Sequence, residues 1–447
     1  MSGEGILTFG PESTALIQSL RAFPIELIGT PAWMKQQDAI QRLNAEAHRQ
    51  VVAQSEEWVM QALVDEGKVE VLLHELIAVE IWRERVYPHL KEKASQHDFV
   101  RMKVYMILFH ETNLVNLLEV LLYHASVASS LGDMGLELAD YCFRRLLYLS
   151  SVDDLSSFLK KTETAAELDK LSDLDELEKQ CKTITFNTAM SAITLVRYLA
   201  EHAEVIPMGV LSRMLNQNDI VLHLVEVLSN KPWRVRHKKK WHVFEDGGWK
   251  EIERDEVQRI GKIEGQLWLA FTYLLLGPEC RKRYEYTEQK KQVILQIRNH
   301  LTEVLVDQLP VLQDMRRYLD ELSLMPAPEA TAAKSFMLEQ VPETREKLLN
   351  SIRDWKRFAL DVVAAFSRQT DEEKKEEISR LANLISSAGF EELLDEPKCE
   401  LCGKDAEKRC SRCKTAWYCS RECQLAGWKK HKPFCQMVTD GGAAAKK

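Results

Sequence analysis

The stretch CELCGKDAEKRCSRCKTAWYCSRECQLAGWKKHKPFC, residues 399–435, holds seven of the ten cysteines of this 447-residue chain. Residues 1–9 (MSGEGILTF) show neither a basic nor an apolar targeting region, so we expect the chain to stay in the reducing cytosol or nucleus. Disulfides are rare there. The seven cysteines and His431 supply eight soft or borderline ligands, which is enough for two tetrahedral zinc ions.

The eight ligands can pair sequentially or in an interleaved way. A Cys-x2-Cys turn places two thiolates on one metal, and ligands four apart on a helix share a face. Sequential pairing makes two separate metal sites, one after the other along the chain. Interleaved pairing joins both ends of the segment, which has almost no apolar core, and so small a domain requires cross-links of this kind. We therefore favour two interleaved zinc sites, one made of Cys399, Cys402, Cys419 and Cys423, and the other of Cys410, Cys413, His431 and Cys435.

This ladder, with Trp417-Tyr418 before Cys419 and Gln424 after Cys423, resembles the MYND zinc finger family, whose pattern has the same interleaved ligation. The resemblance implies that the finger captures short, extended, proline-rich peptides. It also implies that Ser411, Gln424 and Trp428 bond the peptide main chain and pack on its apolar side chains. The alternative is that the Trp428 ring only fills the core of the finger. Four protein ligands at each zinc leave no open position for water, so we expect structural metals.

Charge argues against a nucleic-acid partner. The chain carries a net charge of −8, whereas proteins that bind a phosphate backbone need a basic face. Residues 429–432 (KKHK) are interpreted as a solvated helix face. The three remaining cysteines, Cys142, Cys181 and Cys280, lie singly in apolar stretches and are interpreted as small buried hydrophobes.

Helical periodicity dominates the first 395 residues. Residues 341–369 show apolar positions three or four apart, with Pro342 where a first turn tolerates proline, and residues 255–276 end at Gly277-Pro278, a glycine cap followed by a stop. Thr370 and Glu373 form a capping box before a helix with Ile378, Leu381 and Ile385 inward. The segments 114–122 and 220–228 are apolar nearly all round, which predicts interior helices.

These helices predict an all-α fold, with a stacked body of the armadillo or HEAT kind, although no strict repeat near 40 residues is visible. One small β-hairpin is predicted at 241–252 around a glycine turn. The basic run 234–240 before it could be a localisation signal or a site for an acidic partner, and a solvated loop is the favoured interpretation. Residues 151–179 are interpreted as an acidic exposed loop with a marginal helix.

The predicted organisation has five parts. They are a helical body at 1–324, a Pro/Ala linker at 325–334, a helical segment at 335–395 leading to the finger, the finger at 399–435, and a disordered tail at 436–447. No run is apolar enough for a membrane span.

The sequence contains no phosphate-binding loop, dinucleotide fingerprint or nucleophile elbow. His74-Glu75 and His110-Glu111 lack the second histidine of a metalloprotease helix. A methyltransferase that joins a MYND finger to a SET domain is also excluded, because the finger is C-terminal, the body is helical and the Asn-His-Ser-Cys motif is absent. We therefore expect no enzymatic activity.

Five longer stretches extend the resemblance through nearly the whole chain: LRAFPIELIGTPAW, VEVLLHELIAVEIWRERVYP, LSRMLNQNDIVLHLVEVLSNKPW, LLLGPECRKRY and KRCSRCKTAWYCSRECQ. They resemble the MYND-finger family of axonemal dynein assembly factors. The resemblance implies a cytoplasmic adaptor for motile cilia, concentrated at centriolar satellites, the centrosome and the apical region of ciliated cells. Its implied partners are leucine-rich-repeat assembly factors, chaperones, prolyl-isomerase-type co-chaperones and dynein chains as clients. The alternative is a nuclear corepressor adaptor that binds proline-rich motifs.

Overall fold

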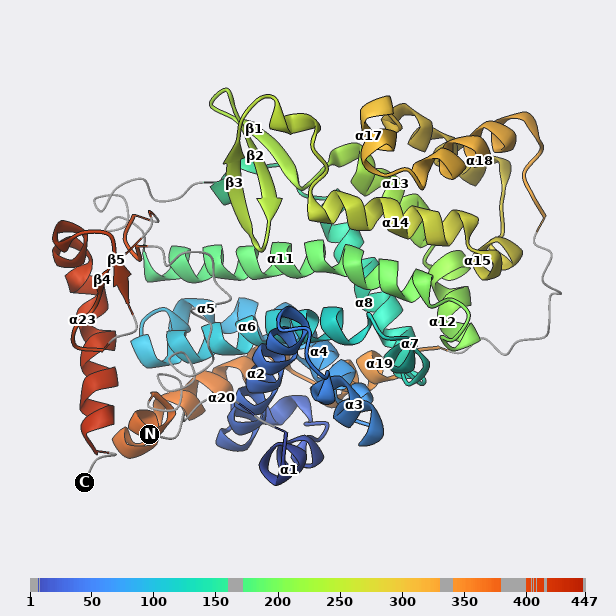
Figure 1. Ribbon diagram of the computed structural model, residues 1–447. Helices are drawn as coiled ribbons and strands as arrows, with labels where there is room; N and C mark the ends of the chain where they lie inside the picture. Colours follow the sequence, from blue (N-terminus) through green and yellow to red (C-terminus); the bar gives the residue numbers. More distant parts are fainter. Residues whose placement is uncertain are drawn as a thin grey trace.

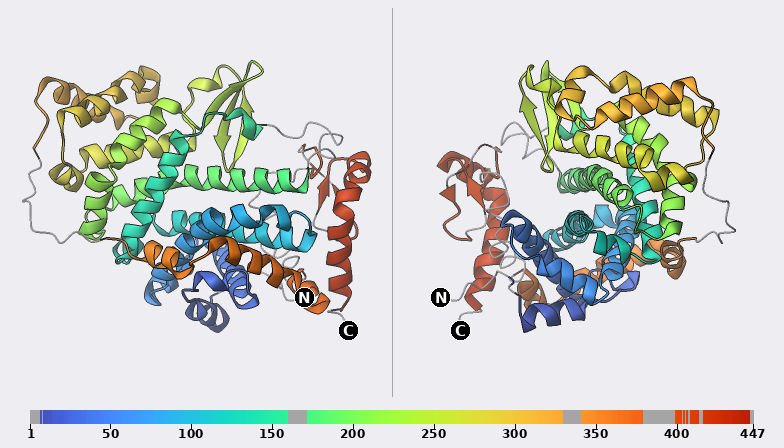
Figure 2. Two further views of the ribbon diagram at one scale, coloured as in Figure 1. Left: turned by 180° about the vertical axis from the view of Figure 1, so that it is seen from behind. Right: turned by 45° about the vertical axis from the view of Figure 1, so that its right-hand side comes forward.

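The computed structural model describes residues 7, 9–159, 172–329, 341–378, 399–402, 404, 406, 408–413 and 416–444. The body is mostly helical, with one small antiparallel sheet, and the finger stands to one side of it (Figures 1 and 2). The elements before the sheet are α1 (Pro11–Ser19), η1 (Ile25–Leu27), α2 (Pro31–Val52), α3 (Trp58–Asp65), α4 (Val69–Ile81), η2 (Trp82–Val86), α5 (Tyr87–Ala94), α6 (Asp98–Leu121), α7 (Ala125–Ser129), α8 (Met134–Ser150), α9 (Ser156–Leu159), α11 (Asp173–Glu201), α12 (Met208–Ser212), η3 (Arg213–Gln217) and α13 (Ile220–Asn230).

The sheet and the helices after it complete the body. These elements are β1 (Arg234–His237), β2 (Lys240–Glu245), β3 (Gly248–Ile252), η4 (Glu256–Gln258), α14 (Lys262–Leu276), α15 (Pro278–Arg283), α16 (Glu288–Leu295), η5 (Gln296–His300), α17 (Glu303–Gln308), α18 (Leu312–Leu324), α19 (Thr344–Ser351) and α20 (Trp355–Ser367). The finger contributes β4 (Lys408–Arg409), β5 (Trp417–Tyr418) and α23 (Arg421–Ala444).

Helix α11 is the centre of the body. Its 29 residues begin at a capping box in which Ser172 and Asp175 exchange hydrogen bonds, so this end of the predicted acidic loop is helical. The helix packs most extensively against α14, α6 and α8. In Figure 1, α14 lies above it, α6 lies below it and α8 crosses it. Two layers of helices therefore share one long interior element.

The two segments predicted to be interior helices are buried. Residues 114–121 lie in α6, with Leu122 as its C-cap, and residues 220–228 lie in α13. The apolar side chains at most of these positions are inaccessible to solvent. One continuous apolar core runs from Leu7 to Phe366. The regular armadillo or HEAT stacking remains a prediction, since the helices gather around α11.

The sheet is larger than the predicted hairpin. Strands β2 and β3 form that hairpin around Asp246-Gly247, and the basic run predicted as a solvated loop supplies a third strand, β1, paired antiparallel with β2. Arg234 anchors this strand because its guanidinium bonds the Glu264 carboxylate of α14 at 3.1 Å. The two-residue turn Lys238-Lys239, with φ values of 46° and 69°, joins β1 to β2.

The predicted stop at Gly277-Pro278 has a different conformation. Helix α14 does end at Leu276, but Gly277 has φ −59° and is not left-handed. Pro278 then occupies the first turn of a new helix, α15, where its missing N–H costs nothing. The glycine and proline therefore turn the chain between two helices.

Residues 341–369, predicted as one helix, form two. Ile352 is extended, and the Asp354 side chain accepts a hydrogen bond from the N–H of Arg357 at 2.9 Å, which starts α20 as a separate helix. These helices are part of the body and do not form a separate segment leading to the finger. Helix α19 packs on α4 and α8, and α20 packs on α5, η2 and α6 (Figure 1).

Helix α20 approaches the N-terminal part of the chain most closely at Gly29. This glycine has φ +82°, and an added Cβ would lie 2.5 Å from Cζ of Phe366, so only glycine fits. Farther along, Lys103 of α6 donates to the Glu377 carboxylate at 3.1 Å, and both side chains are buried.

The capping box at Thr370 is present. The N–H of Glu373 donates to the Thr370 hydroxyl at 3.2 Å, and the N–H of Thr370 donates to the Glu373 carboxylate at 2.8 Å. Residues 371–378 are helical and Ile378 is buried. The part of the acidic loop at 160–171, the linker from 330 to 334, the boundary near 395, Leu381 and Ile385 lie outside the described residues.

The tail differs from the prediction of disorder. Helix α23 continues to Ala444, so residues 436–444 extend the last helix of the finger. Among the described residues, one helix, α6, has the length and composition to cross a membrane. Of its 18-residue apolar window, 61% is buried inside the structure, and core helices of soluble proteins pass the same test.

Candidate metal centre

Two short strands and one helix carry the eight predicted ligands. Strands β4 and β5 pair antiparallel, with Arg409 opposite Trp417, and the N–H of Cys410 donates to Ala416 at 2.8 Å to close the loop between them. The Ser420 hydroxyl accepts from the N–H of Cys423 at 3.2 Å and so begins α23. His431 and Cys435 follow on the same helix, one turn apart.

The structure gathers the ligands into the two interleaved groups. In the first group, Sγ of Cys402 lies 3.4 Å from that of Cys419 and 3.8 Å from that of Cys423, and the Cys419 and Cys423 sulfurs are 3.5 Å apart. Cys399 completes this group, with all ligand atoms within 4.8 Å of one another.

The second group is more deeply buried. Sγ of Cys410 lies 3.8 Å from Sγ of Cys435, and Sγ of Cys413 lies 3.3 Å from Nε2 of His431. All four side chains of this group are buried. Nε2 therefore faces the metal position, and Nδ1 is left for a second contact.

Both groups fit zinc. Zn–S bonds of about 2.3 Å in a tetrahedron place sulfurs about 3.8 Å apart, close to the distances found here. All seven cysteines are free thiols, and four thiol or imidazole ligands around one point are the donor set that zinc prefers. The finger holds two structural zinc ions, one in each group.

Ionisation of the thiols differs within each group. Burial opposes ionisation of Cys410, but the main-chain N–H groups of Cys413 and Arg412 and the His431 ring lower its pKa to about 6. Burial and neighbouring thiols raise the pKa of Cys435 to about 12. In the first group, the pKa of Cys399 is lowered to about 7 by main-chain N–H groups despite burial, and neighbouring thiols raise that of Cys419 to about 12. Without metal only part of each group ionises, so metal binding must release protons.

Glu400 links the two groups. It stands inside the first Cys-x2-Cys turn, yet its Oε2 lies 4.0 Å from Nδ1 of His431 in the second group and accepts a hydrogen bond from the Tyr418 hydroxyl at 3.3 Å. A carboxylate beside the distal nitrogen of a metal-bound histidine fixes the ring orientation. Nothing in the sequence around Glu400 singles it out, because only the fold brings it next to His431.

Apolar burial in the finger is small. Tyr418, Ala406 and Ala416 are buried among the ligands, and Trp417 and Trp428 pack partly against them. So small a core supplies little folding energy, and metal binding must supply most of it.

Of the three predicted peptide-binding residues, Ser411 and Trp428 lie next to ligands of the second group, and Gln424 directly follows Cys423 of the first. Ser411 is exposed directly after Cys410, and Gln424 and Trp428 are half-buried, one turn apart on α23. The Trp428 ring lies 5.8 Å from the His431 ring, centroid to centroid. Leu425 is 68% exposed beside them and was not predicted. The peptide-binding role stays a prediction.

Other candidate residues belong to the body. His74 contacts the carbonyl of Phe23 at 2.9 Å, and Nε2 of His110 lies 3.7 Å from the Glu75 carboxylate in the core. Burial raises the pKa of Cys142 and of Cys280 to about 12. Cys181 is half-buried, and burial raises its pKa to about 11. At neutral pH these thiols stay protonated.

The fold and the metal groups define a class: a mostly helical protein with a C-terminal MYND finger. Residues 399–435 match the family described as MYND finger. Over nearly its whole length the chain is similar to Zinc finger MYND domain-containing protein 10 homolog of Drosophila melanogaster, with 29% identity over 454 residues, 95% of this chain and 98% of the relative. This confirms the long-range resemblance expected from the five quoted stretches.

Two further similarities cover the finger alone. Human Egl nine homolog 1 is 54% identical over 43 residues, 9% of this chain and 10% of that protein. Ubiquitin carboxyl-terminal hydrolase 19 of Arabidopsis thaliana is 49% identical over 43 residues, 9% of this chain and 6% of that protein. No solved structure matches the chain. Because these matches cover the finger and not the helical body, the finger is a module that also occurs in other proteins.

Proposed function

We propose that the protein is a non-enzymatic adaptor for cytoplasmic preassembly of axonemal dynein arms in motile cilia. The observation that carries this proposal is the similarity to the Drosophila MYND-domain relative across 95% of the chain, body included. That relative's name indicates a MYND-domain protein and no catalytic domain. The dynein role comes from the family resemblance of the long sequence stretches.

The finger is proposed to dock a short linear motif of a partner protein. Its second metal group holds the Cys410–Cys413 turn against α23. Ser411 is exposed on that turn, and Gln424, Leu425 and Trp428 follow one another along α23. A half-buried indole and an exposed leucine offer apolar surface, while serine and glutamine offer hydrogen bonds to an extended main chain. Because the zinc ions fix this surface before binding, little ordering entropy is lost on docking.

The metal sites support an adaptor role. Each group has four protein ligands, which leaves no coordination position for an activated water. The helical body, proposed to be of the armadillo kind, offers a second surface for a client. Binding two proteins at once raises their mutual effective concentration without any chemical step.

The proposed partners are leucine-rich-repeat dynein assembly factors, chaperones with prolyl-isomerase-type co-chaperones, and dynein chains as clients. The proposed location is the cytoplasm, with concentration at centriolar satellites, the centrosome and the apical region of ciliated cells. Nucleic acid is not a proposed partner, because the chain carries a net charge of −8.

The test is affinity purification from ciliating cells with three chains: wild type, Trp428→Ala and the control Lys429→Ala. Lys429 is exposed next to the tryptophan, so its removal leaves the half-buried indole in place. We expect Trp428→Ala to keep two zinc ions and to lose assembly factors by about tenfold or more, as for an interface hot spot. Normal recovery with Trp428→Ala would contradict the docking role. Chromatin factors in place of dynein chains and chaperones would favour a nuclear corepressor adaptor.

A further inference from the structure

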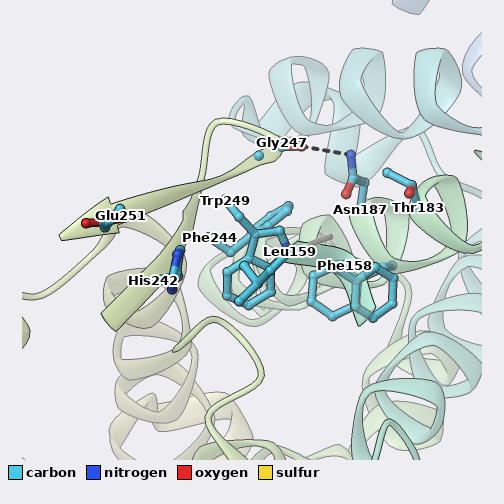
Figure 3. A pocket seen from close by; sticks show the side chains of 11 residues that line it. Phe158, Leu159, Thr183, Asn187, His242, Phe244, Gly247, Trp249 and Glu251 are labelled. Atoms are coloured by element: carbon cyan, nitrogen blue, oxygen red, sulfur yellow. Dashed lines mark hydrogen bonds between the residues drawn. The ribbon is translucent and has the colours of Figure 1, made fainter. Parts of the chain in front are cut away.

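A pocket of about 330 Å³ opens between the sheet and α11, far from the metal groups in sequence (Figure 3). Four aromatic rings form its apolar wall: Phe158 of α9, Phe186 of α11, Phe244 of β2 and Trp249 of β3. Neighbouring rings lie 4.4 to 5.9 Å apart, centroid to centroid, so the wall is rigid. This volume is at the low end of small-molecule sites, which span about 300–1,000 Å³, and suits one large side chain.

Polar groups surround the aromatic wall. The Asn187 amide donates to the Gly247 carbonyl at 3.1 Å and fixes the β2–β3 turn on α11 (Figure 3). Opposite each other in the sheet register, His242 and Glu251 line the other end of the pocket. Nδ1 of His242 is buried and has no hydrogen-bond partner among the described residues. It can bond a polar atom that enters with a ligand.

The basic hairpin tip adjoins this end. Arg236, Lys238, Lys239 and Lys240 are all exposed there, in a chain of net charge −8. Lys240 bonds the Glu251 carboxylate at 2.6 Å, so the basic tip and the pocket share a border. These four cations lie within five residues, on the β1–β2 turn and the strand ends beside it, and together they create a local positive potential that attracts an acidic segment.

Strand β3 offers main-chain groups along the same border. Asp246 and Gly247 have φ values of 50° and 75°, so Glu245 and Gly248 close a two-residue turn as a hydrogen-bonded pair. Alternation along β3 then directs the N–H and C=O groups of Trp249 and Glu251 outward, at the edge of the sheet. No described residue outside the sheet hydrogen bonds to those groups.

We propose that this border is a second docking site, independent of the finger, for an acidic peptide segment of a partner protein. The segment adds to the edge of β3 in extended form and places one aromatic or large aliphatic side chain against the ring wall. Its carboxylates lie beside Lys238 and Lys239. Strand addition supplies main-chain hydrogen bonds, the pocket selects the anchor residue, and the cations select acidic flanks.

The experiment measures fluorescence anisotropy with the full-length, zinc-loaded chain. The probe is a fluorescein-labelled peptide in which one phenylalanine stands between two pairs of acidic residues. Thr183→Trp fills the pocket from the exposed face of α11, and Lys238→Gln with Lys239→Gln removes charge at the tip. We expect binding to weaken about tenfold or more with Thr183→Trp, as for loss of an anchor pocket. The double lysine variant should weaken binding about three- to tenfold, with the difference lost at high salt.

Lys35→Gln with Lys93→Gln is the matched control, because both lysines are exposed on α2 and α5, across α11 from the sheet (Figure 1). A probe with serine in place of phenylalanine tests the pocket without changing the protein, and it should bind about tenfold more weakly. Hydrogen exchange should slow in residues 248–252 when the probe binds.

Three outcomes would overturn the proposal. The first is no binding of the probe to the wild-type chain. The second is equal binding of the phenylalanine and serine probes. The third is that the chain binds phosphatidylserine vesicles but not the probe, and that vesicle binding is lost in the double lysine variant and kept in Thr183→Trp. That result would assign the tip to anionic lipid. Because the site lies outside the finger, Trp428→Ala should leave probe binding unchanged, which separates this test from that of the proposed function.

Discussion

At the scale of single residues, Glu400 is the most informative position. It occupies the turn that carries Cys399 and Cys402 but faces His431 of the other group. Its carboxylate therefore stands between the two metal groups, 4.0 Å from Nδ1 of His431. A residue of this kind controls how firmly an adjacent histidine holds its metal.

We expect Glu400→Gln to speed zinc release from the Cys410 group by about tenfold, in the range found for outer-shell partners of metal-bound histidines. The reason is that the amide keeps the shape of the side chain but loses the charge facing Nδ1 of His431. Release is measured with a chromogenic chelator on the full-length chain. Glu422→Gln is the control, since it removes an exposed carboxylate in the first turn of α23. Equal release rates in both variants would show that Glu400 has no positioning role.

The eight ligands could be predicted because zinc chemistry restricts both residue type and spacing within a short segment. The structure assembles those same eight side chains into two groups. Glu400 could not be predicted in the same way. A glutamate within a turn is usually exposed to solvent and has no partner. The proximity of Glu400 to His431 exists only after both metal groups have folded the segment.

At the scale of elements, α6 and α11 meet through a charged residue inside a helical interface. Glu119 of α6 accepts a hydrogen bond from the Ser191 hydroxyl of α11 at 3.1 Å. Burial raises the pKa of Glu119 to about 7, although Ser191, Thr194 and the charge of Lys262 oppose the shift. The folded state therefore keeps a proton that the unfolded state has already lost.

This shift predicts how stability depends on pH. Between pH 4.5 and 7 the unfolded chain binds fewer protons at this site than the folded chain, so the glutamate lowers stability as pH rises through that range. We expect Glu119→Gln to raise the free energy of unfolding by about 1–3 kcal/mol above pH 7, with the gain shrinking toward pH 5. Melting temperatures at pH 5, 6, 7 and 8 test this. The exposed Glu321→Gln is the control, and a gain that did not change with pH would contradict the assignment.

The presence of a helix was easier to predict than the residues at which it begins and ends. The apolar stretches in α6 and α13 were interpreted correctly because burial on all sides leaves a strong local signal. Strand β1 was missed because basic residues such as Arg234 and its neighbours are typical of exposed loops. They form a strand only through pairing with β2 and the bond from Arg234 to Glu264. The break at Ile352 was missed because the helical period continues through it, while Asp354 caps a second helix.

At the scale of the whole molecule, the finger and the body have different sources of stability. The body has a continuous apolar core, whereas the finger has two metal groups and few buried apolar side chains. Metal removal should therefore unfold one part and leave the other folded.

Native mass spectrometry should find two zinc ions on each wild-type chain and one on Cys413→Ala, because each ion needs four ligands. Chelation should remove both ions while the far-ultraviolet circular dichroism of the helical body stays nearly constant, since residues 399–435 are a small part of 447. Cys142→Ala is the control for loss of a cysteine outside the finger. Cooperative unfolding of the whole chain on chelation would show that the finger and the body form a single folding unit.

The overall architecture was the part least accessible to prediction. The periodicity of residues 341–369 indicates a helix but carries no information on its partners, which lie more than 200 residues earlier in α4, α5 and α8. Such pairings depend on shape fits like that of Phe366 over Gly29. A degenerate sequence pattern cannot encode them locally.

The late return of α20 to the start of the chain has a consequence for synthesis. The N-terminal helices leave the ribosome long before residues 355–367 do. The apolar surface beside Gly29 and Ile107, which Phe366 covers in the folded protein, therefore stays exposed for most of translation. A premature stop codon anywhere before Trp355 would leave this apolar surface permanently exposed. The truncated product should then be a target for cellular quality control even though every helix before the stop has been made.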